Sequence, residues 1–169
     1  MKRAFFLIII CLILLPTLAQ AQKRRTPSKK STVAKSDPSK EVRAGAGRVA
    51  EQIKVLSKFL YILGGVWKGI EVADVAAQRG EASQAVIDQT QRNKATVRDS
   101  IKIVREGLDK LELDFRLKPE LQRYYTSLAG SAAGAATAED QAAASQFDAA
   151  GRSLLAVVNR LTNVLLEMP

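Results

Sequence analysis

Residues 49–70 read VAEQIKVLSKFLYILGGVWKGI, and their large apolar side chains recur at alternating steps of four and three residues. The series consists of Val49, Ile53, Leu56, Leu60, Leu63, Trp67 and Ile70. Because an α-helix completes a turn every 3.6 residues, this spacing places the series along one face, as the a/d seam of a heptad repeat. The stretch therefore predicts a long helix that packs against other helices.

The same spacing recurs farther along the chain. A second helix is predicted over residues 81–115, with the seam Val97, Ile101, Val104, Leu108, Leu111 and Phe115. A third, shorter helix opens at Lys118-Pro119 and carries Leu121, Tyr124, Tyr125 and Leu128. A fourth starts near Thr137 and carries Phe147, Leu154, Val157, Leu161 and Val164. No alternating pattern typical of strands competes with these helices.

These patterns predict an all-α fold in one domain, residues 38–169. Short connections favour antiparallel neighbours, so we expect an up-down helical bundle with three long helices and one short one. Asp37 and Pro38 supply a capping side chain and a first-turn proline, and Gly80 suits a helix cap before a tight turn. Since the helices differ in length, one end of the bundle should be thinner than the other.

The N-terminus has the pattern of a secretory signal peptide, residues 1–21. Lys2 and Arg3 precede an apolar run over residues 4–15, and Ala19-Gln20-Ala21 forms a small-x-small cleavage site. We expect an exported protein, periplasmic or extracellular, that begins at Gln22. The alternative is an uncleaved segment that anchors the protein in a membrane, although a span needs about 20 apolar residues.

The composition disfavours several classes of site. Cys11 is the only cysteine and lies within the predicted signal peptide, and the chain has no histidine. The mature protein is therefore expected to have no disulfide, and zinc, haem and histidine-based triads are disfavoured. No paired-carboxylate pattern is evident either. We expect no metal, no cofactor and no enzymatic activity.

The positive charge is concentrated near the N-terminus. Residues 22–48 contain nine Lys or Arg against two Asp or Glu, whereas residues 49–169 contain fifteen of each kind. Residues 22–37 carry too little apolar surface to fold, which predicts a disordered basic tail. Six of its side chains are candidates for contacting anionic surfaces: Lys23, Arg24, Arg25, Lys29, Lys30 and Lys35.

The partner of this tail is expected to be an anionic envelope component, either a membrane surface or a polymer. Another envelope protein is an alternative partner, and a solvated spacer without a partner is the simplest alternative. Basic arms also bind nucleic acid, but export argues against that partner.

Three glycines surround the only tryptophan. Gly64, Gly65 and Gly69 predict a helix kink, close packing against the Ala-rich residues 138–150, or an apolar pocket beside Trp67. Residues 130–136, GSAAGAA, lack the ending of a phosphate-binding loop and indicate a flexible connector or a poorly ordered helix end.

Two adjacent tyrosines form a further candidate site. Tyr124 and Tyr125 point about 100° apart on a helix, so one should pack inside while the other lies exposed and stacks on a ring-shaped ligand such as a sugar.

Together these features favour a non-enzymatic binding or structural module of the cell envelope. One alternative is a carrier or sensor of a small apolar ligand near Trp67. Another is a homo-oligomer assembled through exposed seam residues. The sequence identifies no family on which to choose among them.

The cleavage site gives the first testable prediction. N-terminal sequencing of the protein recovered from expressing cells should begin at Gln22, because signal peptidase cleaves after the small residue that ends the small-x-small pattern. Recovery of a membrane-embedded form that retains Met1 would contradict cleavage and support the anchor.

Overall fold

The computed structural model describes residues 37–169, which form five helices and no strand. The helices are α1 (Pro38–Gln78), α2 (Gln84–Leu117), α3 (Gln122–Leu128), α4 (Ser131–Ala143) and α5 (Phe147–Glu167). The expected all-α fold is confirmed for this range. The predicted signal peptide, and the basic side chains Lys23, Arg24, Arg25, Lys29, Lys30 and Lys35, lie outside the described residues.

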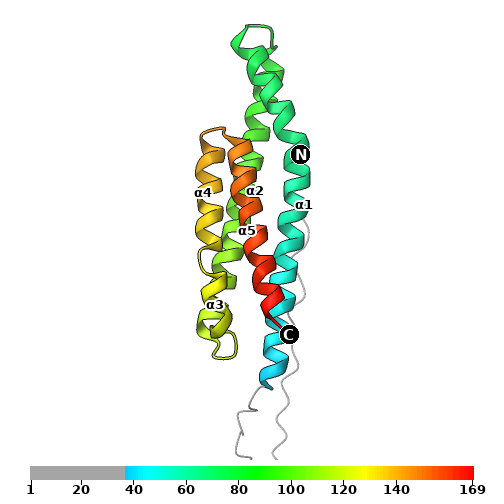
Figure 1. The fold of residues 1–169 in the computed structure, drawn as a ribbon. Coiled ribbons are helices and arrows are strands. Elements are labelled where there is room, and N and C mark those ends of the chain that lie inside the picture. The colour runs from blue at the N-terminus through cyan, green and yellow to red at the C-terminus, as the bar shows by residue number, and fades with distance from the viewer. Residues whose placement is uncertain (1–36) are drawn as a thin grey trace, which may run out of the picture. The chain divides into compact units, whose positions relative to one another are not determined.

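The helices run back and forth around one core (Figure 1). α2 returns along α1, α3 and α4 then follow each other in the direction of α1, and α5 returns once more. α1 packs on α2 and α5, while α4 packs on the same two helices from the other side. Helices α3 and α4 thus share one column of a four-column arrangement, as a bundle requires.

The predicted seams account for most of the core. All six seam residues of α2 are buried. Of the seven predicted seam residues of α1, Val49, Leu56, Leu63 and Ile70 are buried, whereas Ile53, Leu60 and Trp67 are partly buried. The partly buried set lies on the flank of α1, and there Leu60 and Trp67 border a hollow shared with α5.

The helix predicted from Thr137 is in fact two helices, α4 and α5. Ser145 adopts a left-handed conformation, φ 60°, between them. The amide of Ser145 donates to Ala142 O and the amide of Gln146 donates to Gln141 O, which is the hydrogen-bond pattern of a Schellman cap. Glycine is the usual residue at this position, so the break has no recognisable signal in the sequence.

The Ala-rich run is an ordered part of α4, which corrects the expectation of a flexible connector. Ser131, Ala132 and Ala135 are buried, and the amide of Ala132 donates to Glu112 Oε1 of α2 at 2.9 Å. A Cβ at Gly134 would lie 2.7 Å from Val157 Cγ2 of α5. Small side chains order this segment because they let α4 approach its neighbours closely.

The expected start and end signals of α1 are confirmed. Asp37 caps the helix by accepting a hydrogen bond from the amide of Ser39 at 3.1 Å, and Pro38 is the first helical residue. Gly80 adopts φ 71° just beyond the last turn.

The α1–α2 hairpin extends past the turn that joins α4 to α5 (Figure 1). α1 has 41 residues and α2 has 34, whereas α5 has 21. At about 1.5 Å per residue these lengths correspond to about 60, 50 and 30 Å. Near its tip the hairpin therefore lacks the two columns that cover it elsewhere.

The α2 seam makes a matched pair of variants available. Leu108 is fully buried, whereas Leu113 on the same helix is 51% exposed. Leu108→Ala should reduce the free energy of unfolding by about 2 to 5 kcal/mol, as buried large-to-small changes do. Leu113→Ala should cost under about 1 kcal/mol. Denaturant unfolding of both variants measures the difference, and equal costs would contradict the burial of the seam.

Candidate functional site

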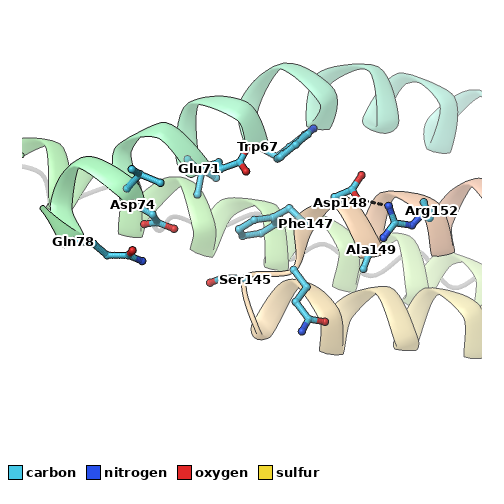
Figure 2. Close-up of a pocket in the computed structure, with 12 residues that line it drawn as sticks. Trp67, Glu71, Asp74, Gln78, Ser145, Phe147, Asp148, Ala149 and Arg152 are labelled. Carbon is cyan, nitrogen blue, oxygen red and sulfur yellow. Dashed lines mark hydrogen bonds and ion pairs between the residues drawn. The ribbon is translucent and has the colours of Figure 1, made fainter.

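A hollow of about 580 Å³ lies between the last turns of α1 and the start of α5, together with the two residues that precede α5 (Figure 2). Its apolar lining residues include Trp67, Ile70, Val75 and Phe147. The polar side chains around it include Glu71, Asp74, Gln78, Asp148 and Arg152. The hollow thus combines aromatic rings with a mostly acidic border.

A second hollow of about 240 Å³ continues toward the middle of the bundle. It is lined by Leu60 and Gly64 of α1 and by Gly151 and Leu155 of α5, among others. Both hollows are lined by Trp67, Phe147, Asp148 and Arg152. We refer to the two together as the α1–α5 groove.

Two glycines keep the inner part of the groove open. A Cβ at Gly64 would meet no atom within 4 Å, and a Cβ at Gly151 would reach only Leu63 Cδ2, at 3.8 Å. Larger side chains at these two positions would project into space that the fold leaves empty. The outer part is open for a different reason, namely that α1 continues beyond the first residue of α5.

The acidic groups of the groove are held in ion pairs. Asp74 Oδ2 lies 2.7 Å from Lys94 Nζ of α2, Glu71 Oε2 lies 3.4 Å from Lys68 Nζ, and Asp148 pairs with Arg152. Lys68 Nζ also lies 5.0 Å from the centre of the Trp67 ring, in a cation–π contact. These contacts orient the polar border of the groove.

The structure separates the predicted pocket residues. Trp67 and Gly64 line the groove, but Gly65 and Gly69 are exposed and do not. No atom lies within 4 Å of a Cβ at Gly64, Gly65 or Gly69. The expectation that these glycines pack closely against residues 138–150 is therefore wrong, because α1 turns them toward solvent or the groove.

Several residues of the groove have no clear signal in the sequence. Phe147 is recognisable there only as a seam residue, and nothing in the local pattern distinguishes Gly151, Leu155 or Arg152. Gly151 and Leu155, four residues apart on α5, are a weak signal in the sequence. They indicate a groove only once the structure places them opposite Gly64 of α1.

The two tyrosines lie on α3, away from the groove. Tyr124 is buried, and its hydroxyl accepts a hydrogen bond from Arg123, whose guanidinium carbon lies 4.5 Å from the ring centre. Tyr125 is partly buried and packs against the core. The expected exposed ring is thus absent from this pair.

A cluster of four charges joins the start of α1 to the end of α2. Lys118 Nζ lies 2.7 Å from Glu41 Oε1 and 2.8 Å from Asp114 Oδ1. Arg48 Nη2 lies 3.0 Å from Glu41 Oε1 and 2.8 Å from Asp114 Oδ2. The buried Asp114 Oδ2 and Arg48 Nε have no partner in hydrogen-bond geometry among the described residues, so charge attraction dominates this contact.

The cluster shifts the pKa values of its members. Hydrogen bonds from Lys118 and Arg48 lower the pKa of Glu41, and hydrogen bonds to Asp114 and Glu41 raise the pKa of Lys118. Both shifts favour the charged forms.

Residues 37–169 contain neither a membrane span nor a metal-binding cluster. None of the helices in this range is both long enough and apolar enough to cross a membrane. The same residues bring together no group of three or more His, Cys, Asp or Glu side chains that could hold a metal ion.

The lowered pKa of Glu41 predicts an acid-dependent loss of stability. Because the pKa is lower in the folded than in the unfolded chain, the unfolded chain binds the proton first, and stability falls as the pH drops below the ordinary glutamate value of about 4.3. Glu41→Gln should lower the melting temperature at neutral pH and flatten its decline in acid. Glu51→Gln, at an exposed pair with Lys54, is the matched control. An unchanged acid profile in Glu41→Gln would contradict the role of the cluster.

The chain matches no protein-family model, no curated protein and no solved structure. Its groove, its charges and its fold are therefore the features from which a function can be inferred.

Proposed function

We propose that this protein is an exported, non-enzymatic binding module of the cell envelope, held at an anionic surface by its basic tail. The distribution of charge carries this proposal. Residues 22–36 contain six Lys or Arg and no Asp or Glu, whereas residues 37–169 contain eighteen basic and seventeen acidic side chains. Almost all of the excess charge of the predicted mature chain therefore belongs to the tail.

The charges of the bundle support this division. Arg48, Lys94 and Arg105 each pair with a carboxylate on another helix, and Lys118 does the same with Glu41. Cations used in this way hold the helices together and contribute little net attraction to a distant surface. Each Lys or Arg of the tail, by contrast, contributes about 1 kcal/mol near an anionic membrane before salt screens it.

A second candidate function is favoured by the α1–α5 groove. Its larger hollow, about 580 Å³, falls within the range of about 300 to 1,000 Å³ typical of small-ligand sites. Aromatic and apolar surface bordered by oriented polar groups is the usual composition of such sites. The bundle is thus a candidate carrier or sensor of a small, largely apolar ligand beside Trp67.

If the proposal is correct, binding to anionic membranes depends on the tail and not on the helical bundle. Deletion of residues 22–35 should abolish binding to vesicles that contain anionic lipid, while leaving helicity and melting temperature unchanged, because the deletion precedes α1. Binding of the intact protein should weaken steeply between 0.01 M and 0.15 M salt, over which the Debye length falls from about 30 Å to about 8 Å. Vesicle co-sedimentation with circular dichroism measures both effects.

Two controls separate charge from other causes. A tail of unchanged length with Lys23, Arg24, Arg25, Lys29, Lys30 and Lys35 replaced by Gln should behave like the deletion. Lys58→Gln with Lys110→Gln, at exposed positions of the bundle, should bind like the unmodified protein. If the deletion binds as tightly as the intact protein, or if salt has no effect, the tail is a spacer.

A further inference from the structure

We infer that the tip of the α1–α2 hairpin, residues 71–96, opens and closes as a unit while the rest of the bundle stays folded. The closed tip forms one wall of the larger hollow of the α1–α5 groove, so that hollow is complete only while the tip is closed. The inference is independent of the basic tail. It depends on three features, which are the missing apolar core of the tip, a single ion pair between its helices and a group of glycines at its base.

The tip has no apolar core. Ile70 on α1 and Val97 on α2 are the last buried apolar side chains before the turn, and they are 3% and 6% exposed. Between them only Thr90 is buried, and its hydroxyl donates to Val86 O of its own helix rather than to α1. Helices α4 and α5 turn back before they reach the end of the hairpin (Figure 1). A segment with so little buried apolar surface opens at a lower cost in free energy than the core does.

One ion pair joins the two helices of the tip. Lys94 Nζ of α2 lies 2.7 Å from Asp74 Oδ2 of α1. Residues 71–96, all of which the structure describes, form no other ion pair or side-chain hydrogen bond from one helix to the other. The side chain of Lys94 is only 14% exposed, so this pair is screened less than a surface pair. The contact between Lys94 and Asp74 therefore favours the closed state.

Three glycines lie at the base of the tip. Gly64, Gly65 and Gly69 fall within the two turns of α1 that precede the tip, and a Cβ at any of them would meet no atom within 4 Å. Close packing therefore does not explain the glycines. Because glycine favours helix less than any residue except proline, α1 bends or unwinds most easily at this point. These three residues thus have the properties of a hinge.

Opening of the tip would change one part of the groove and spare the other. The tip lines the larger, outer hollow with Glu71, Asp74, Val75 and Gln78 (Figure 2). The smaller, inner hollow is lined by α5 and by residues of α1 up to Trp67, and no residue of the tip borders it. An open tip would therefore remove a wall of the outer hollow and leave the inner hollow in place.

Hydrogen exchange of the full chain, followed by mass spectrometry, tests the opening. Amides throughout both helices of the tip should be protected to a similar degree, and at least about a hundredfold less than amides around Leu56 and Leu108 in the core. Low concentrations of denaturant should accelerate exchange in the tip less than in the core, because local opening exposes little surface. Equal protection of tip and core would overturn the inference. Protection that falls gradually toward the turn would show fraying and overturn the opening as a unit.

A first pair of variants tests the ion pair. Lys94→Gln should lower the protection of the tip amides at least about fivefold, because it leaves the carboxylate of Asp74 without its cation. Lys68→Gln removes an exposed ion pair with Glu71 within α1 and should change tip protection by less than about twofold. Equal effects of the two substitutions would mean that the contact between the helices does not hold the tip closed.

A second pair of variants tests the hinge. Gly69→Ala should raise the protection of the tip amides about fivefold, because alanine makes unwinding of α1 at this point less favourable. Gly47→Ala, at another exposed glycine of α1 without neighbours within 4 Å, should leave tip protection unchanged. Circular dichroism should show the same helicity in both variants. If Gly69→Ala protects the tip no better than Gly47→Ala does, the glycines are not its hinge.

Discussion

The burial of one heptad-spaced line of side chains along α1 is the interaction on which the rest of this structure depends. Val49, Leu56, Leu63 and Ile70 lie 3% exposed or less and face a core that α2, α4 and α5 complete. At about 1.5 to 3 kcal/mol for each fully buried side chain, this line contributes on the order of 6 to 12 kcal/mol before conformational entropy is subtracted. It also fixes which flanks of α1 remain available for other contacts.

One such flank, together with a difference in helix length, produces the groove. α1 and α2 continue after α4 and α5 have turned back, so the hairpin tip has fewer neighbours than the rest of the bundle (Figure 1). Phe147 is the first residue of α5, and Trp67 of α1 lines the same hollow beside it. Gly64 and Gly151 extend the same opening inward, because neither has a side chain with which to fill it.

Charge is used in two different ways along the chain. Within the bundle, Glu41, Arg48, Asp114 and Lys118 neutralise one another and join the start of α1 to the end of α2. Residues 22–36, by contrast, contain six basic side chains and no acidic one. Under the function proposed above, the tail would contact an anionic surface while the bundle keeps its fold.

The sequence alone determined the all-α fold, the start of α1, its cap at Gly80 and the α2 seam, because helical periodicity and capping are local properties of neighbouring residues. Only the tertiary structure decided where α4 ends, since Ser145 adopts a conformation for which glycine is the usual signal. The groove could not be predicted in full from the sequence either. The sequence pattern indicated Trp67 and Gly64 as pocket residues, but it did not indicate Phe147, Gly151 or Leu155. Whether two glycines form a floor or merely face solvent depends on the register of α1 against α5, and that register is set by packing between residues more than eighty positions apart.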